Sequence, residues 1–244
     1  MNRYKQAIVS SVIILLITAQ FAFVQYSGDD DKFVSYEVDT KKQDLSMYWK
    51  DEKNHAFGSI QNLKNSLDSN GQKLVFAMNG GMFKSGNSPQ GLFIQQYKSI
   101  TALDTATGNG NFYLKPNGVF YTTSGNDAVI CKTQNFINSK KIKYATQSGP
   151  ILVIDGQIHA AFKPGSTNVN IRNGVGILPN GHVLFAMSKE AINFYDFAIY
   201  FKNAGCRNAL YLDGFVSRTY LPAKKWVQTD GNFGVIIGVT SGRQ

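Results

Sequence analysis

Short apolar segments alternate with turn residues along most of the chain. The segments are four to seven residues long and are rich in β-branched and aromatic residues. This pattern is typical of β-strands. We expect strands at residues 33–38, 73–78, 91–95, 111–114, 119–122, 151–154, 174–178, 182–187, 209–212 and 233–239.

Three of the joints between these segments carry strong turn sequences. Residues 116–118 and 179–181 read Pro-Asn-Gly, and residues 155–156 read Asp-Gly. Asn and Gly tolerate the positive φ angles that tight hairpins require. The joints therefore predict hairpins and a mostly antiparallel sheet.

Two stretches, residues 56–69 and 193–203, have the periodicity of amphipathic helices. The apolar faces comprise Ile60, Leu63 and Leu67 in the first and Phe194, Phe197, Ala198 and Phe201 in the second. Gly71 and Gly205 follow the two stretches, as is typical of helix ends. Because strands outnumber helices, we expect an α+β fold, with a few helices packed on a mostly antiparallel sheet.

The N-terminus has the pattern of a targeting segment. Residues 2–5 carry basic charge, and residues 7–24 are uncharged and mostly apolar. This arrangement predicts a secretory signal peptide or a single membrane anchor at residues 1–27, then a short polar linker at 28–32 and one domain at 33–244. We expect an exported protein that is periplasmic, extracellular or anchored to the cytoplasmic membrane, with membrane contact only through the N-terminal segment.

Composition indicates a globular protein. Hydrophobic residues make up 43% of the chain and charged residues 17%, which excludes general disorder. The net charge of +9 favours an anionic partner, although it equally serves solubility. No nucleic-acid-binding motif accompanies the charge, so we expect no nucleic acid partner.

The chain contains two cysteines, Cys131 and Cys206. In an oxidising compartment they would form one disulfide, and otherwise they are two buried thiols. Two thiols are too few for a four-cysteine zinc site, and no carboxylate-rich loop suggests a dedicated metal site. We expect no cofactor, and leave open a weakly bound divalent cation between Asp213 and a substrate phosphate.

Polar residues and glycines interrupt the apolar pattern at five strand or helix ends. These places are Asn79-Gly80-Gly81, Ser148-Gly149, Arg172-Asn173, Asp196 and Asp213 with Ser217. Each has an ordinary explanation as a turn, a cap or a charge at a helix N-terminus. Taken together, they predict one polar pocket to which several strand ends contribute.

The motifs around these places, in their order along residues from about 70 to 240, resemble the phosphodiester glycosidase family. The motifs are NGGMF (79–83), PQGL (89–92), GNFYLKPNGVFY (110–121), QSGPILVIDG (147–156), RNGVGI (172–177), NFYDFA (193–198) and ALYLDGFVS (209–217). The family includes the lysosomal uncovering enzyme, which removes N-acetylglucosamine from a sugar phosphodiester. One departure stands out: the family pattern LDGGGS appears here as LDGFVS, with Phe215 and Val216 in place of two glycines.

The resemblance implies an exported hydrolase that cleaves a sugar-phosphate diester of a glycan or cell-envelope substrate. In such an enzyme Asp213 would be the general base or nucleophile, Asp196 the second carboxylate and Asn79 a positioning group. The phosphate would be bound by Arg172. The other groups expected near the phosphate are the backbone of Gly80, Gly81, Ser148 and Gly149 and the side chains of Asn173 and Ser217.

Two other functions fit the same sequence. A non-catalytic carbohydrate- or envelope-binding module would suit the bulk of Phe215 and Val216. A phosphodiesterase that breaks the P–O bond would use similar groups. Structural roles are also open, with Asp213 as a turn cap and Arg172 in an ion pair with Asp196 or Asp213.

Overall fold

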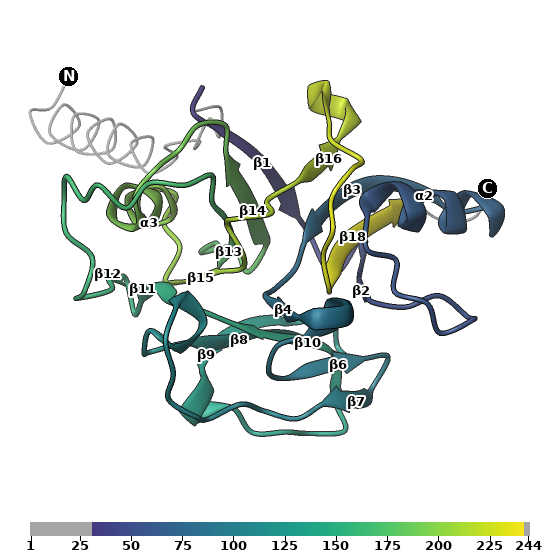
Figure 1. Ribbon diagram of the computed structural model, residues 1–244, viewed down its shortest axis with the longest axis horizontal. Coiled ribbons are helices and arrows are strands. Elements are labelled where there is room, and N and C mark those ends of the chain that lie inside the picture. The colour runs from purple at the N-terminus through teal and green to yellow at the C-terminus, as the bar shows by residue number, and fades with distance from the viewer. Residues whose placement is uncertain (1–30, 242–244) are drawn as a thin grey trace, which may run out of the picture.

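The computed structural model describes residues 31–241. The expected leader at 1–27, and residues 28–30 of the expected linker, lie outside the described residues. Figure 1 shows the described chain as three antiparallel sheets with two helices on their outer faces. Within residues 31–241, no helix has the length and apolar character that a bilayer crossing requires.

The largest sheet has six strands in the order β1-β14-β13-β15-β11-β12, and we call it the six-stranded sheet. Its neighbours pair antiparallel throughout. The strands are β1 Phe33–Val38, β14 Val183–Ser188, β13 Asn173–Ile177, β15 Asn208–Tyr211, β11 Ile151–Ile154 and β12 Gln157–Ile158.

Two five-stranded sheets complete the frame, and we name each after its central strand. The β10 sheet comprises β7 Lys98–Thr101, β6 Phe93–Gln95, β10 Ile142–Ser148, β8 Gly118–Thr123 and β9 Ala128–Lys132. The β3 sheet comprises β17 Trp226–Val227, β16 Thr219–Leu221, β3 Lys73–Asn79, β18 Ile236–Ser241 and β2 Asp44–Tyr48. A small ribbon of β4 Phe83–Lys84 and β5 Ser88–Pro89 follows β3.

The three sheets share one hydrophobic core. Phe185 of the six-stranded sheet, Phe120 of the β10 sheet and Phe76 of the β3 sheet are each at most 1% exposed and belong to the same cluster. Phe185 contacts both other rings, at centroid distances of 5.2 Å to Phe76 and 5.9 Å to Phe120. Burial of this shared cluster is the main force that holds the sheets against one another.

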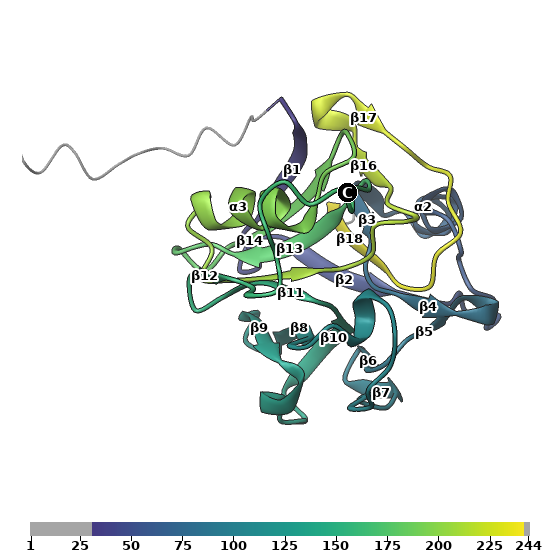
Figure 2. The same ribbon diagram turned by 60° about the vertical axis from the view of Figure 1, so that its left-hand side comes forward.

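Each helix covers a different sheet (Figure 2). Helix α2 (Ile60–Ser69) has Ser59 as its N-cap, and the Ser59 hydroxyl accepts a hydrogen bond from the Asn62 N–H. The helix packs on the β3 sheet. Helix α3 (Phe194–Asn203) has Asn193 as its N-cap and packs Phe197 and Phe201 on the six-stranded sheet. The apolar faces predicted for both helices are confirmed. The first helix begins at Ile60 and not at Ala56, because Ser59 is its N-cap.

The antiparallel, single-domain α+β fold is confirmed, and most predicted strands lie within a residue or two of the observed ones. Two predictions were wrong in detail. Residues 111–113 form a 3₁₀ helix, and the last strand begins at Ile236 rather than at 233. The strands β2, β7, β9, β10 and β16 and the two-residue strands β4, β5, β12 and β17 were missed.

The turn predictions had mixed success. Two of the three predicted hairpins are confirmed. Residues 155–156 connect β11 to β12, and residues 179–181 lie in the connection from β13 to β14. Residues 116–118 do not form a hairpin, because β8 pairs with β9 and β10 and the preceding segment is the 3₁₀ helix.

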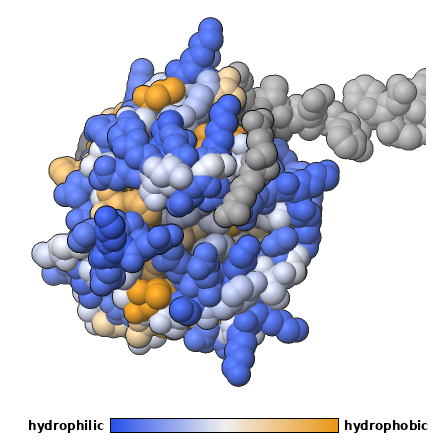
Figure 3. Space-filling model, turned by 90° about the vertical axis from the view of Figure 1, so that its right-hand side faces the viewer, coloured by the Kyte–Doolittle hydropathy of each residue, from blue (hydrophilic) through white to orange (hydrophobic). Residues whose placement is uncertain are grey.

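The face over α2 is largely hydrophilic, with separate small hydrophobic patches (Figure 3).

Candidate functional site

The predicted polar residues converge where the three sheets meet. Asn79 ends β3, Ser148 ends β10 and Asn173 begins β13. Asp213 lies two residues beyond the end of β15, and Ser217 lies two residues before β16. Four segments that are distant in sequence therefore reach one place in the fold.

Two buried amides connect three of these segments. The Nδ2 of Asn173 donates to both the carbonyl oxygen and the Oδ1 of Asn79, at 2.9 Å each, while its Oδ1 accepts from the Asp213 N–H at 2.8 Å. The Nδ2 of Asn79 donates to the Asp213 carbonyl at 3.3 Å. The Arg218 N–H donates to the Oδ1 of Asn79 at 3.0 Å. Both amides are fully buried, so these bonds satisfy groups that have no access to water.

Two hydroxyl groups hold the backbone of the same loop. Ser217 Oγ donates to the Asp213 carbonyl at 2.7 Å, and Ser148 Oγ donates to the Leu212 carbonyl at 2.5 Å. Both serines are buried. The peptide groups on either side of Asp213 are thus fixed by side chains from all three sheet regions, which gives the carboxyl group a defined position.

The carboxyl group of Asp213 lies in a strongly perturbed environment. The residue is 9% exposed, and burial raises its pKa from 3.8 to about 7. A backbone N–H bond from Phe215 opposes this shift but is the smaller effect. No ion pair involves this carboxyl within the described residues. At neutral pH the group is therefore present in both protonation states.

The glycine after Asp213 allows this loop to pack closely. A Cβ atom on Gly214 would overlap the Tyr211 hydroxyl and would lie 2.7 Å from the Ile171 carbonyl oxygen. Only glycine fits at that distance. The Asp-Gly pair is thus explained by packing against the segment before β13.

Arg172 is completely buried beside this loop. Its Nε donates to the Ile192 carbonyl at 2.7 Å and one terminal nitrogen donates to the Asn168 carbonyl at 2.8 Å. The guanidinium carbon lies 3.6 Å from the centre of the Phe194 ring, a cation–π contact. The other terminal nitrogen has no hydrogen-bond partner. Burial lowers the pKa of this group, and among the described residues it forms no ion pair with Asp196 or Asp213.

Tyr211 interacts electrostatically with both Arg172 and Asp213. The guanidinium carbon of Arg172 is 5.6 Å from the Tyr211 ring centre. Burial raises the pKa of Tyr211 to about 12, with the Asp213 charge raising it further and the Arg172 charge lowering it. The cation and the carboxylate are therefore neighbours of the same phenol, on the same side of the molecule.

Asp196 lies apart from this network. It is exposed in the first turn of α3, where Asn193 Nδ2 donates to its Oδ2 at 2.8 Å. In return the Asp196 N–H donates to Asn193 Oδ1 at 2.9 Å. These reciprocal bonds cap the helix, and its negative charge also complements the helix N-terminus. The structure thus gives Asp196 a capping position and leaves Asp213 as the carboxylate of the network.

The glycines expected to bind the anion are buried between sheets. The N–H of Gly80 donates to the Val235 carbonyl at 2.8 Å and is therefore already engaged. A Cβ atom on Gly81 would lie 2.7 Å from Thr146 Oγ1, and one on Gly149 would lie 2.6 Å from Asn117 Cβ. These positions need glycine because neighbouring segments approach closely.

The site residues proposed from sequence omitted Arg218, Gln147 and Tyr211. Arg218 is the solvent-accessible cation of the site: its side chain is 35% exposed and its Nε donates to Asp230 at 2.8 Å. Gln147 is fully buried, and its Oε1 accepts from the Asp104 N–H at 2.9 Å. Arg218 directly follows Ser217, a signal that sequence analysis could have used. Gln147 begins the QSGPILVIDG motif but was assigned no role, and Tyr211 reads as an ordinary strand residue.

The two cysteines are free thiols. Cys131 is half-buried in β9, whereas Cys206 is buried beside α3 in the cluster that includes Phe201. Burial raises the pKa of Cys131 to about 11 and that of Cys206 to about 12, which makes both poor nucleophiles. Because both thiols are free, the disulfide alternative does not occur in this structure. No cluster of three or more His, Cys, Asp or Glu side chains suited to a metal occurs in residues 31–241.

Comparison with known proteins shows the family to which the chain belongs. The model of the phosphodiester glycosidase family matches residues 72–238. The Escherichia coli (strain K12) protein YigE, described as uncharacterized, is 39% identical over 188 residues, which cover 77% of this chain and 73% of YigE. The chain therefore belongs to the phosphodiester glycosidase family.

Solved structures share the fold at low sequence identity. The catalytic domain of zebrafish N-acetylglucosamine-1-phosphodiester alpha-N-acetylglucosaminidase, auto-inhibited by its pro-peptide, has a TM-score of 0.53 at 12% identity, covering 86% of this chain and 89% of that one. A putative exported protein from Burkholderia pseudomallei K96243 has a TM-score of 0.58 at 9% identity, covering 85% and 73%. A hypothetical protein from Synechocystis has a TM-score of 0.53 at 13% identity, and this chain covers 60% of its length.

Proposed function

We propose that this protein hydrolyses a sugar phosphodiester of a glycan or cell-envelope substrate outside the cytoplasm, with Asp213 as its reactive carboxylate. The observation that carries the proposal is the buried Asp213 carboxyl, whose backbone is fixed by Asn173, Asn79 and Ser217 and whose pKa is about 7. Perturbed carboxyl groups of this kind are concentrated at functional sites. Membership of the phosphodiester glycosidase family supports the reaction class.

The chemistry of the leaving group suits a site with one carboxylate. Cleavage of the sugar C–O bond releases a phosphate monoester, which is already a stable anion and needs little protonation. Asp213 would then act in its ionised form, either by activating water or by attacking the anomeric carbon. A pKa near 7 keeps a large fraction ionised at neutral pH while making the carboxylate more basic than an ordinary aspartate. Water is the only co-reactant this scheme requires.

Two arginines differ in how they can serve the phosphate. Arg218 has a partly exposed side chain, and its bond to the exposed Asp230 can be exchanged for a phosphate oxygen. Arg172 has no exposed surface, so in this conformation it does not contact the phosphate directly. It would influence the site through the adjacent Tyr211 and through the terminal nitrogen of Arg172 that has no hydrogen-bond partner. We therefore assign direct phosphate contact to Arg218 and a positioning role to Arg172.

Hydrolysis in ¹⁸O-labelled water tests the reaction type. The substrate is an N-acetylglucosamine-1-phosphate diester, the substrate type named for the zebrafish relative. If the sugar C–O bond breaks, the label appears in the released sugar. Label in the phosphate would instead support the phosphodiesterase alternative, with P–O cleavage.

A binding module is the second candidate, and the position of Asp196 favours it. With Asp196 capping α3, the network holds one carboxylate, whereas most glycosidases use two. Asp213→Asn separates the two functions. A catalyst loses turnover and keeps its affinity for the substrate, whereas a wild-type protein that binds glycan phosphodiesters without ever cleaving them would establish the binding module.

A further inference from the structure

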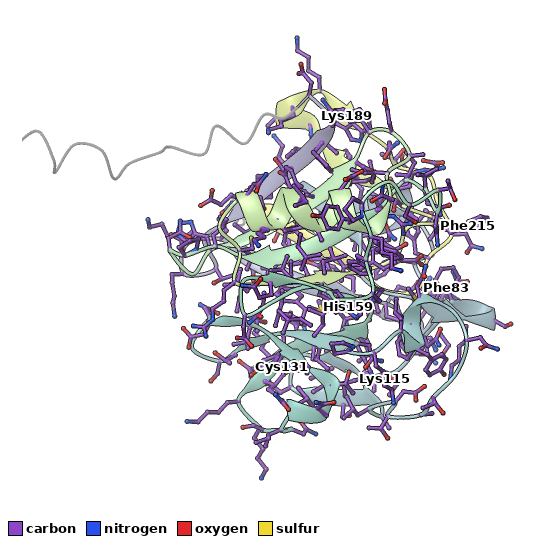
Figure 4. The ribbon with its side chains drawn as sticks, turned by 90° about the vertical axis from the view of Figure 1, so that its left-hand side faces the viewer. Phe83, Lys115, Cys131, His159, Lys189 and Phe215 are labelled. Atoms are coloured by element: carbon purple, nitrogen blue, oxygen red, sulfur yellow. The ribbon has the colours of Figure 1, made fainter. Side chains whose placement is uncertain are left out.

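Phe215 is the most exposed large hydrophobic residue in the described part of the chain, with 91% of its surface accessible. It lies two residues from Asp213 on the loop that carries the reactive carboxylate. Figure 4 shows Phe215 at the edge of the molecule, toward the same side as Phe83 of the NGGMF segment. A water-exposed aromatic ring gains no packing energy in the free protein.

The loop that presents this ring is firmly anchored. Gly214 packs against Tyr211 and the Ile171 carbonyl, and the Ser217 N–H donates to the Gly214 carbonyl at 3.2 Å. Val216 is half-buried against the cluster under α2. Only Phe215 points away from these anchors, so the loop holds the ring outward in a restricted range of positions.

A second exposed apolar residue belongs to the segment that packs against Gly214. Val169 is 48% exposed and precedes by two residues Ile171, whose carbonyl contacts Gly214. Single exposed apolar residues are normal on protein surfaces, but Phe215 and Val169 belong to two segments that touch beside the candidate reactive carboxylate, where an apolar ligand face can bind.

We propose that Phe215 is a specificity-determining residue that stacks against a sugar ring of the substrate lying beyond the scissile phosphodiester. This inference rests on the proposed function and names its substrate class as a phosphodiester with an extended glycan. A pyranose presents C–H groups on one face and hydroxyl groups on its rim. The Phe215 ring accommodates the C–H face, while the anionic phosphate stays near Arg218 and Asp213.

The kinetic consequence follows from where the contact is made. The stacked ring lies away from the reacting bond, so the contact is equal in the ground state and the transition state. Its loss raises KM for extended substrates and leaves kcat unchanged. Substrates that lack the additional sugar make no contact with Phe215, and their kinetics do not depend on it.

The experiment compares four proteins on two substrates. The proteins are wild type, Phe215→Ala, Phe215→Trp and the control Ile137→Ala, which removes an 83% exposed apolar side chain from the loop before β10. The substrates are N-acetylglucosamine-1-phosphate methyl diester and the diester of the same sugar phosphate with a disaccharide. Melting temperatures confirm that all four proteins are folded.

We expect Phe215→Ala to raise KM for the disaccharide diester about tenfold, with kcat within about twofold of wild type. The methyl diester should be cleaved equally by both, Phe215→Trp should retain the wild-type preference, and Ile137→Ala should match wild type. Equal KM values for Phe215→Ala and wild type on the disaccharide diester, or equal losses on both substrates, would overturn the proposal.

Binding separates this inference from the proposed function. If wild type cleaves neither diester, the proposed function fails, and titration of the disaccharide diester by calorimetry then decides the role of Phe215. About tenfold weaker binding by Phe215→Ala than by wild type supports the stacking role. Equal affinities, or no binding to either protein, refute it.

Discussion

At the residue scale, Asp213 is the residue on which the proposed activity depends. Its backbone N–H and carbonyl are satisfied by Asn173, Asn79 and Ser217, whereas its carboxyl is buried without a cation. A buried carboxylate destabilises the folded state unless it is paired. The arrangement thus stabilises the position of the group while leaving its charge unfavourable, which is typical of functional residues.

Asp213→Asn should stabilise the protein at alkaline pH. The carboxyl pKa is about 7 in the folded state and 3.8 as its model value, so stability is lost as pH rises from about 4 to about 7. The amide removes this loss, and we expect a gain of roughly 2–4 kcal/mol in the free energy of unfolding at pH 8 and almost none at pH 4. Urea denaturation at both pH values measures it.

The control for this substitution is Asp155→Asn, at an exposed turn position. Its effect should be below about 0.5 kcal/mol at both pH values. A gain for Asp213→Asn that is equal at pH 4 and pH 8 would show that the carboxyl is not destabilised by its charge.

Asn173→Ala should destabilise the protein and also change the pH dependence of activity. The substitution leaves the buried Asp213 N–H and the Asn79 Oδ1 each without one partner. We expect a loss of roughly 2–4 kcal/mol in unfolding free energy. Denaturation measures the loss, with the exposed Asn138→Ala as the control that should change it by less than about 0.5 kcal/mol.

Activity distinguishes positioning from general stability. If Asn173 positions Asp213, Asn173→Ala lowers kcat and shifts the apparent pKa of the pH profile at temperatures where the protein is fully folded. An unchanged profile would mean that Asn173 is only a structural residue.

At the element scale, the close approach of the Asp213 loop to the start of β13 requires glycine at position 214. Gly214→Ala should push the loop away from Tyr211 and Ile171, with a loss of roughly 1–3 kcal/mol in stability and at least a tenfold loss in kcat. Denaturation and steady-state kinetics measure both effects. Gly125→Ala is the matched control, because its nearest neighbour would be 3.3 Å away. Equal behaviour of the two variants would contradict the packing explanation.

Local patterns predicted the elements whose pairing is local. The Asp155-Gly156 turn and the two amphipathic helices were correct because their signals lie within a few residues. The hairpin predicted at Pro116-Asn117-Gly118 was wrong, because a turn sequence does not determine which strands pair. Strand β10 was missed, since Lys143, Thr146 and Gln147 make it polar in sequence although most of it is buried.

At the scale of the whole molecule, the candidate site is formed by the meeting of three sheets. Sequence analysis correctly predicted that strand-end residues gather, and Asn79, Ser148, Asn173, Asp213 and Ser217 do so. It did not predict the position of Asp196, because the sequence around a helix start is the same whether a carboxylate caps the helix or faces a substrate. It also did not predict that Arg172 is buried, since burial depends on the contacts made by Phe194 and Asn168.

The pH dependence of kcat/KM for an N-acetylglucosamine-1-phosphate diester tests the central claim most directly. If the ionised Asp213 carboxylate is the reactive group, kcat/KM rises about tenfold per pH unit below its pKa and levels off above about pH 7. Asp213→Asn should remove both the activity and this profile. A rate that is constant from pH 5 to pH 8, or an Asp213→Asn variant as active as wild type, would contradict the account.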